Sequence, residues 1–189
     1  MSSTMIKGAA LRSMLVASEE LYGKEGVEAV LQRLDDEQGA ILVAPLAVQF
    51  YSVEVSAAYH EALRVVHGKG TWAASYAVGL AAARIDFTGI YRVLLRAVSY
   101  DLIWDRMEAA WKQYNSQGSV EWTERTKGLV RGQISGVAGY NGGMWHSAAG
   151  RAAGLVLLAG AKRAVGKVTA SDPTSCRIEV TWDPLRPVI

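Results

Sequence analysis

The sequence contains a single cysteine, three histidines and four prolines, and each scarcity excludes a class of protein. Cys176 has no second cysteine to bond with, so the chain is not a disulfide-stapled secreted domain. No two histidines have the spacing of a helical metal pair, and Cys176 lacks a CxxC partner. Four prolines and scattered glycines also leave no low-complexity linker. We therefore expect no metal site and no other cofactor.

Long apolar runs and a strong charge of either sign are also missing. The most apolar run, residues 155–161, is far shorter than the roughly 20 residues of a membrane-spanning helix. Lys7 and Arg12 interrupt the beginning of the chain, which does not have the pattern of a signal peptide. A net charge of +2 is too small to indicate a nucleic-acid partner. We therefore expect a cytoplasmic protein with no membrane span and no nucleic-acid partner.

What is present is an ordinary globular composition, half hydrophobic and a fifth charged, over 189 residues. This length suits one well-packed core. We predict a single domain over residues 1–189, with a helical part over about 6–117 and a sheet-containing part over about 118–183. The sequence contains no internal repeat of fixed period, which agrees with a single domain.

Apolar residues recur at helical spacing through the first two-thirds of the chain. Gly23 separates the first two predicted helices, because glycine readily takes the conformation that ends a helix. The DDEQG stretch over 35–39 is polar and is interpreted as a loop, and Pro45 suits the first turn of the helix that follows. The predicted helices cover residues 9–22, 24–34, 45–66, 72–83, 87–98 and 100–114.

After Gly118 the pattern changes to alternation, which is typical of half-buried strands. The fold class is therefore α+β, with the N-terminal helical part packed on a C-terminal four-stranded antiparallel sheet. The order within the sheet-containing part is strand–strand–helix–strand–strand. The predicted strands cover 119–124, 129–137, 162–170 and 176–183, and the helix covers 144–159.

Glycines within this part could serve packing or binding. The cluster over residues 139–143 resembles a phosphate-binding loop only superficially, and a turn from strand to helix explains it better. Gly150 and Gly154 are interpreted as letting their helix press against the sheet, although they could also line a cleft. P-loops and serine nucleophile motifs are missing, so we do not predict an enzyme.

Aromatic residues are the best candidates for ligand binding, although core packing accounts for most of the six tryptophans and eight tyrosines. Trp145 and His146 are consecutive and cannot face the same way, so one of them could point into a cleft or toward a partner. The predicted ligand-binding residues are Tyr76, Tyr91, Trp104, Trp111, Trp145 and His146.

The order of short motifs resembles a known superfamily over about residues 6–182. The opening residues resemble the start of heme-nitric-oxide-binding domains, through Ile6-Lys-Gly8, Leu15, Leu21-Tyr22-Gly23, Val27 and Val30-Leu31. The closing half looks like the 4-vinyl-reductase, or hydrocarbon-binding, domain, through Gly142-Gly143, Gly150, Gly154, Gly160-Ala-Lys162 and Cys176-Arg-Ile178-Glu-Val180. TRAPP trafficking subunits share this α/β fold. The nearest resemblance is to uncharacterised paralogous proteins abundant in myxobacteria.

Two features of these relatives are missing. Heme-binding relatives have an axial histidine and a Tyr-x-Ser-x-Arg clamp for the heme propionates. The nearest string here runs from Tyr114 through Ser116 to Gly118, with glycine in the place of the arginine, and His60 and His67 come earlier than the axial ligand would. Some hydrocarbon-binding relatives carry several cysteines that bind metal, whereas this chain has only Cys176. Neither heme nor zinc is expected.

The resemblance implies a non-catalytic regulatory or sensor-type domain that binds a small apolar ligand, a protein partner, or both. The alternative is a structural or adaptor protein that dimerises through its helices without a ligand, as TRAPP subunits do. A homodimer or another protein partner is expected under either hypothesis.

Overall fold

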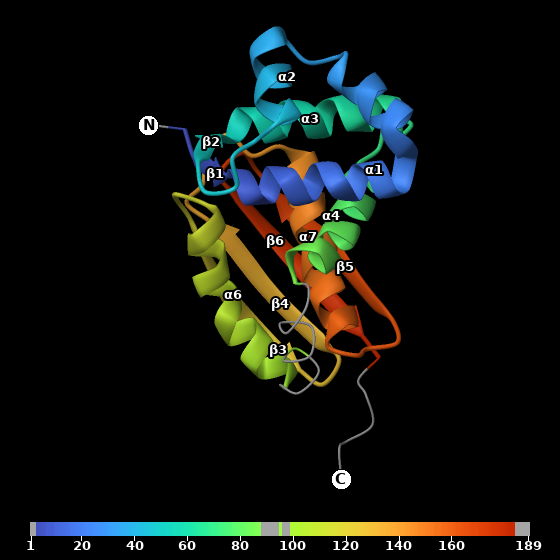
Figure 1. The fold of residues 1–189 in the computed structure, drawn as a ribbon. Coiled ribbons are helices and arrows are strands. Elements are labelled where there is room, and N and C mark those ends of the chain that lie inside the picture. The colour runs from blue at the N-terminus through green and yellow to red at the C-terminus, as the bar shows by residue number, and fades with distance from the viewer. Residues whose placement is uncertain (1–2, 88–94, 96–98, 184–189) are drawn as a thin grey trace.

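A computed structural model describes residues 3–87, 95 and 99–183 of the chain. Four strands form an antiparallel sheet in the order β3-β4-β6-β5 (Figure 1). These strands are β3 (Ser119–Thr126), β4 (Leu129–Ser135), β5 (Ala164–Ser171) and β6 (Ser175–Trp182). The described helices are α1 (Gly8–Leu31), α2 (Asp36–Val43), α3 (Val53–Val66), α4 (Ala73–Asp86), α6 (Tyr100–Tyr114) and α7 (Gly142–Leu158). The predicted α+β class and the strand–strand–helix–strand–strand unit are confirmed.

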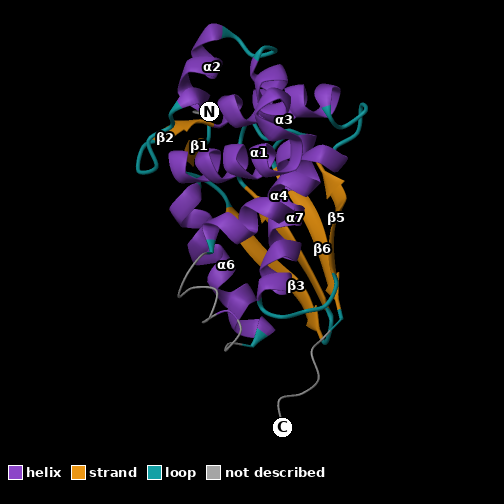
Figure 2. Cartoon of the chain, turned by 45° about the vertical axis from the view of Figure 1, so that its right-hand side comes forward, coloured by secondary structure: helices purple, strands orange, loops and turns teal. Residues whose placement is uncertain are grey.

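The helices cover one face of the sheet in layers (Figure 2). Helix α7 lies against β5 and β6, and α4 lies on α7. Helix α6 runs beside β3, while α1, α2 and α3 gather at one end of the molecule (Figure 1). The alternation in β6 explains this arrangement, because Cys176, Ile178 and Val180 are buried under the helices and Arg177 is exposed on the opposite face.

Helix α7 is mostly apolar because it is covered on two sides. On the sheet side, a Cβ at Gly166 of β5 would come within 2.1 Å of the Ala149 carbonyl oxygen. On the other side, a Cβ at Gly150 would lie 2.3 Å from the Tyr76 carbonyl oxygen of α4. Gly150 and Gly154 therefore serve close packing, as predicted, but their partner is α4 and not the sheet, which approaches α7 through its own Gly166.

Two predictions in the helical part were wrong. The DDEQG stretch belongs to helix α2 and is not a loop, because Asp35 caps the helix by accepting a 2.7 Å hydrogen bond from the Gln38 amide. The next helix begins at Val53, not at Pro45, because residues 50–52 form strand β2 (Phe50–Ser52) against β1 (Met5–Lys7). The predicted break at Gly23 is confirmed by its non-helical φ of +70°. The predicted helix over 87–98 lies almost entirely outside the described residues.

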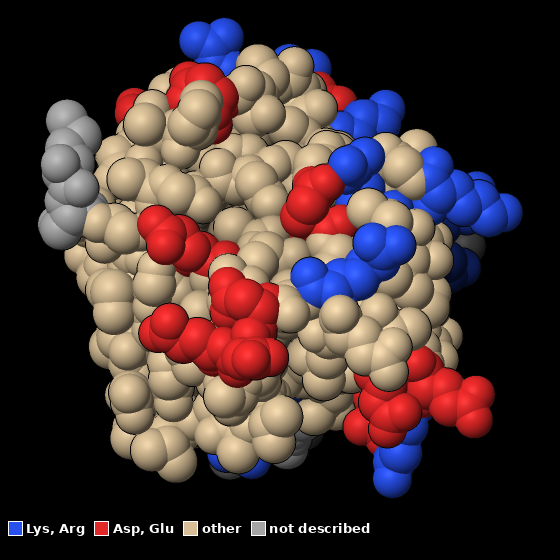
Figure 3. Space-filling model, turned by 90° about the horizontal axis from the view of Figure 1, so that it is seen from above, with Lys and Arg blue, Asp and Glu red and all other residues tan. Residues whose placement is uncertain are grey.

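The surface carries mixed charge, and several of its exposed large apolar side chains lie within residues 43–50. On the end that carries α1, α2 and α3, acidic and basic side chains occur close together (Figure 3). The helices contribute exposed large apolar residues one or two at a time, such as Val65 of α3 and Leu102 of α6. None of the helices that the structure describes is long and apolar enough to cross a membrane.

Candidate functional site

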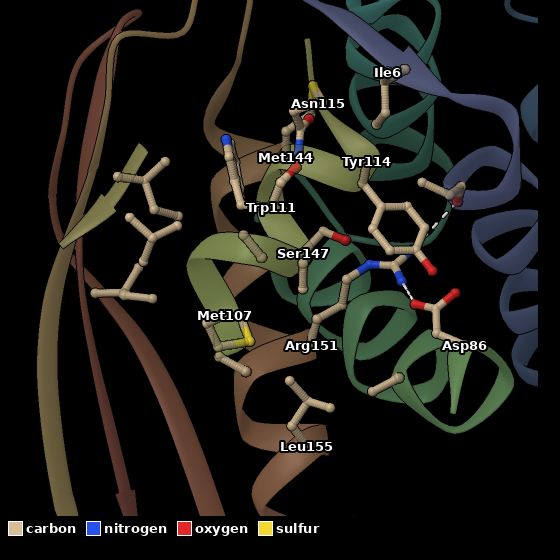
Figure 4. Close-up of a pocket in the computed structure, with 18 of the residues that line it drawn as sticks. Ile6, Asp86, Met107, Trp111, Tyr114, Asn115, Met144, Ser147, Arg151 and Leu155 are labelled. Atoms are coloured by element: carbon tan, nitrogen blue, oxygen red, sulfur yellow. Dashed lines mark hydrogen bonds and ion pairs between the residues drawn. The ribbon is translucent and has the colours of Figure 1, made fainter. Parts of the chain in front are cut away.

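A cavity of about 140 Å³ lies where the helical part meets α6, α7 and the sheet. Segments far apart in the sequence contribute to its wall, and most of the lining side chains are apolar (Figure 4). An engineered protein cavity of about 150 Å³ stays dry and binds benzene or xenon, so this volume suits a small apolar molecule. The apolar and aromatic lining residues include Ile6, Ala10, Met14, Phe87, Met107, Ala110, Trp111, Val120, Trp122, Ile134, Tyr140, Met144, Ala152, Leu155 and Ile178.

Helix α6 forms one wall of the cavity, because its apolar face extends beyond the part that packs into the core. Near its start, Trp104 is 1% exposed and packs against Trp122, which donates a 2.8 Å hydrogen bond to the Trp104 carbonyl. Farther along the same face, Met107, Trp111 and Tyr114 line the cavity. The apolar face of α6 therefore packs into the core at one end and lines the cavity at the other.

One end of the cavity is polar and holds an ion pair between Arg151 of α7 and Asp86 at the end of α4. Their side chains are 24% and 10% exposed, so the pair is largely shielded from water. The Arg151 guanidinium also donates to the Ser13 hydroxyl at 3.1 Å. These contacts hold the arginine in place and neutralise its charge. Figure 4 shows Ser147, one helical turn before Arg151, with its hydroxyl directed toward the space beside Arg151 and Tyr114.

His60 of α3 also lines the cavity and is 2% exposed. Its Nδ1 is buried and has no hydrogen-bond partner among the described residues. Burial, and secondarily the positive charge of Arg151, lowers the pKa of His60 to about 3. The imidazole is therefore neutral near pH 7, and one of its polar atoms is unsatisfied.

The remaining polar side chains bond to one another. Tyr140 donates a 2.6 Å hydrogen bond to the Asn115 side chain, and burial raises the pKa of the Tyr140 phenol. Burial, together with the negative charge of Asp86, also raises the pKa of Tyr114. Both phenols therefore remain protonated near neutral pH. Asp86 and Arg151 are thus the charged groups among the described lining residues, and their charges cancel.

Of the predicted ligand-binding residues, Trp111 is placed in the described wall of this cavity. Trp104 is in the core, and Trp145 is 1% exposed, with its indole donating a 3.1 Å hydrogen bond to the Asp172 carbonyl. The Tyr76 hydroxyl accepts a 3.1 Å hydrogen bond from the Gly166 amide. His146 is half-buried and stacks on the Trp72 ring. Tyr91 lies outside the described residues.

Sequence reasoning missed the polar end of the cavity. Ser147 and Arg151 lie in a helix whose other residues are mostly apolar, and Asp86 lies outside that predicted helix. An isolated arginine in the GRAAG segment was the available signal, because a buried cation requires a partner. The sequence could not identify that partner, which is 65 positions away.

The structural comparisons show the fold of H-NOX domains. The Fe(II) unliganded H-NOX protein from K. algicida aligns with a TM-score of 0.65 and 14% identity, covering 95% of this chain and 98% of that one. A point mutant of the same K. algicida protein aligns with a TM-score of 0.68 and 12% identity over 94% and 97% of the two chains. An oxygen-binding H-NOX domain related to soluble guanylate cyclases aligns with a TM-score of 0.65 and 10% identity over 95% and 96%. Searches with protein-family models and among curated sequences found no match.

Because H-NOX domains bind heme, the described residues were compared with what heme requires. The cavity volume is close to that needed for a benzene-sized molecule and below the roughly 300 Å³ at which drug-sized pockets begin. Trp111, Trp122, Tyr140 and Met144 line this space. The described cavity is therefore too small for a porphyrin.

The propionate clamp does not fit either. A Cβ at Gly118 would lie 2.5 Å from Val137 Cγ1, and Gly118 has φ of +89°, so the backbone leaves no room for an arginine there. The Ser116 hydroxyl already accepts a hydrogen bond from the Met5 amide, and the Asn115 side chain accepts one from Tyr140. No group of three or more His, Cys, Asp or Glu side chains suited to a metal ion occurs among the described residues. The residues present do not fit heme.

Proposed function

We propose that this chain is a non-catalytic sensor-type domain that binds a small apolar molecule, without heme, in the cavity at the junction of its helical and sheet-containing parts. The observation that carries the proposal is the cavity itself, which has the volume of a benzene-binding site and a mostly apolar lining. The H-NOX fold supports it, since the H-NOX relative related to soluble guanylate cyclases binds oxygen.

The position of the cavity suggests how binding would be signalled. Met14 of α1 and His60 of α3 contribute to one side, while Trp111 of α6 and Ile178 of β6 contribute to the others. A ligand in this space contacts both parts of the fold at once, so it favours whichever arrangement of the helices and sheet gives the better contacts. A protein partner that recognises this arrangement would receive the signal.

The adaptor alternative has less support. Helix-mediated dimerisation requires a continuous apolar face, but each described helix has at most two exposed large apolar residues. The homodimer, and the closer relation to 4-vinyl-reductase, TRAPP and myxobacterial proteins, remain predictions from the sequence. Light scattering at high protein concentration tests the dimer.

The proposal is tested first on the purified protein, by native mass spectrometry and by organic extraction of co-purified molecules. Toluene is then added during thermal unfolding, because a ligand that binds only the folded state raises the melting temperature. The matched variants are Ala110→Leu, which fills the cavity from α6, and Ala109→Leu, which adds the same side chain at an exposed position.

Toluene is expected to stabilise the wild type and Ala109→Leu, with a much smaller effect on Ala110→Leu. If toluene leaves the melting temperature of the wild type unchanged, or stabilises both variants equally, the cavity is not the binding site.

A further inference from the structure

The polar end of the cavity restricts the chemical class of ligand that can bind there. Resting on the proposed function, we infer that the ligand is an uncharged aromatic molecule of about one ring that carries a single hydroxyl or carbonyl group, which bonds to His60 and Ser147. This excludes a pure hydrocarbon and an anion as the preferred ligand.

The argument against an anion comes from charge. Asp86 already neutralises Arg151, so the described lining has no net charge. A carboxylate in this space would have to displace Asp86 or remain buried without a counter-ion, and both are costly. His60 does not supply a positive charge, because it is neutral at physiological pH.

The argument against a pure hydrocarbon comes from the polar side chains of His60 and Ser147 in the cavity wall. His60 Nδ1 is buried without a partner, and a hydrocarbon would leave it so. Ser147 is 5% exposed and directs its hydroxyl into the cavity beside Arg151. A hydroxyl or carbonyl on the ligand can bond with both groups, and bonding to His60 Nδ1 removes the cost of leaving that atom unpaired.

The aromatic part of the inference rests on the ring side chains in the wall. Trp111, Trp122 and Tyr140 line the cavity, and aromatic rings pack well against one another in offset or edge-to-face arrangements. With a volume of about 140 Å³, the cavity accepts one ring and a few further atoms.

Three probes that differ in one substituent test the inference: toluene, 4-methylphenol and 4-methylbenzoate. Their dissociation constants are measured at pH 7 by calorimetry. Wild type is expected to bind 4-methylphenol about tenfold more tightly than toluene, since satisfying a buried polar group contributes about that much. 4-Methylbenzoate is expected to bind most weakly.

Two variants remove the polar groups, and a third serves as control. Ser147→Ala and His60→Leu are expected to reduce the preference for 4-methylphenol to about threefold or less, while toluene still binds. Ser75→Ala removes a buried serine hydroxyl that lies outside the described cavity wall, and should preserve the preference. Retained toluene binding shows that a variant is folded with its cavity intact.

The outcomes separate the two proposals. Equal binding of toluene and 4-methylphenol by wild type, or tight binding of 4-methylbenzoate, overturns the inference and leaves the proposed function standing. An unchanged preference in both Ser147→Ala and His60→Leu also overturns it. If toluene does not bind the wild type, the proposed function fails and the inference fails with it.

Discussion

Gly79 of α4 lies against the backbone of Ser147 of α7 so closely that a Cβ at Gly79 would be 2.1 Å from the Ser147 carbonyl oxygen. This contact brings the two helices together one to two turns before Asp86 and Arg151 form their ion pair. It therefore sets the spacing of α4 and α7, both in the core and at the polar end of the cavity where Asp86 and Arg151 lie.

A methyl group at position 79 should push these helices apart. We expect Gly79→Ala to lower the free energy of unfolding by about 1–3 kcal/mol, because the obstructing atoms belong to backbone and cannot rotate away. Gly39→Ala is the control, since Gly39 lies in helix α2 with open space around it, and alanine there should stabilise by about 0.5–1 kcal/mol. Urea unfolding measures both, and a neutral Gly79→Ala would contradict the close approach.

Removing one partner of the buried ion pair should be more damaging than removing both. Asp86→Asn leaves Arg151 buried without a counter-charge, and we expect a loss of about 3 kcal/mol in unfolding free energy. Arg151→Met in the Asp86→Asn background should recover part of this loss, because no buried charge is then left without a partner. A double-mutant cycle by urea unfolding gives the coupling energy, and additive losses would show that the two side chains do not interact.

His60 should make stability depend on pH. Its pKa is lowered from 6.5 to about 3 in the folded protein, so the unfolded chain binds a proton that the folded state excludes. The contribution of neutral His60 to the free energy of unfolding is fully present above pH 6.5. It decreases as the pH falls toward 3, by at most about 1.4 kcal/mol per pH unit.

Urea unfolding between pH 7 and pH 4 measures this slope. His60→Leu should flatten it, whereas Ser147→Ala, which changes the same cavity without a titratable group, should not. The same slope in wild type and His60→Leu would mean that His60 is not the group responsible.

Heme should not bind, even when the missing arginine is restored. Wild-type protein mixed with hemin is expected to show no shift of the Soret band. Gly118→Arg should not create one, and should destabilise the fold because of the clash with Val137 and the positive φ. Gly23→Arg carries a similar φ of +70° in open space and should cost less. A stoichiometric heme complex of either protein would contradict the size of the cavity.

Much of the fold was predictable from local pattern. Alternation identified the four strands of the sheet, as in β6, where Cys176 and Ile178 face the core, and helical spacing identified α6 and α7. Errors occurred where a local polar contact outweighed composition, as at Asp35, which begins α2 within a stretch that resembles a loop. The short pairing of β1 with β2 was missed because three residues give no readable period.

The candidate site was predictable only in part. Helix α6 was predicted over residues 100–114, and Trp111 was among the predicted ligand-binding residues. The helical spacing does not reveal that Trp104 packs in the core while Met107 and Tyr114 line a cavity, because all three obey the same period.

The sequence by itself determined most of the described helices and the four strands of the sheet, because these follow from neighbours along the chain. Only the tertiary structure decided where the cavity lies and that His60, Asp86 and Arg151 meet around it. The physical reason is that these residues come from α3, α4 and α7, whose meeting depends on the close approach of backbones at Gly79 and Gly150. No pattern within a single element encodes that approach.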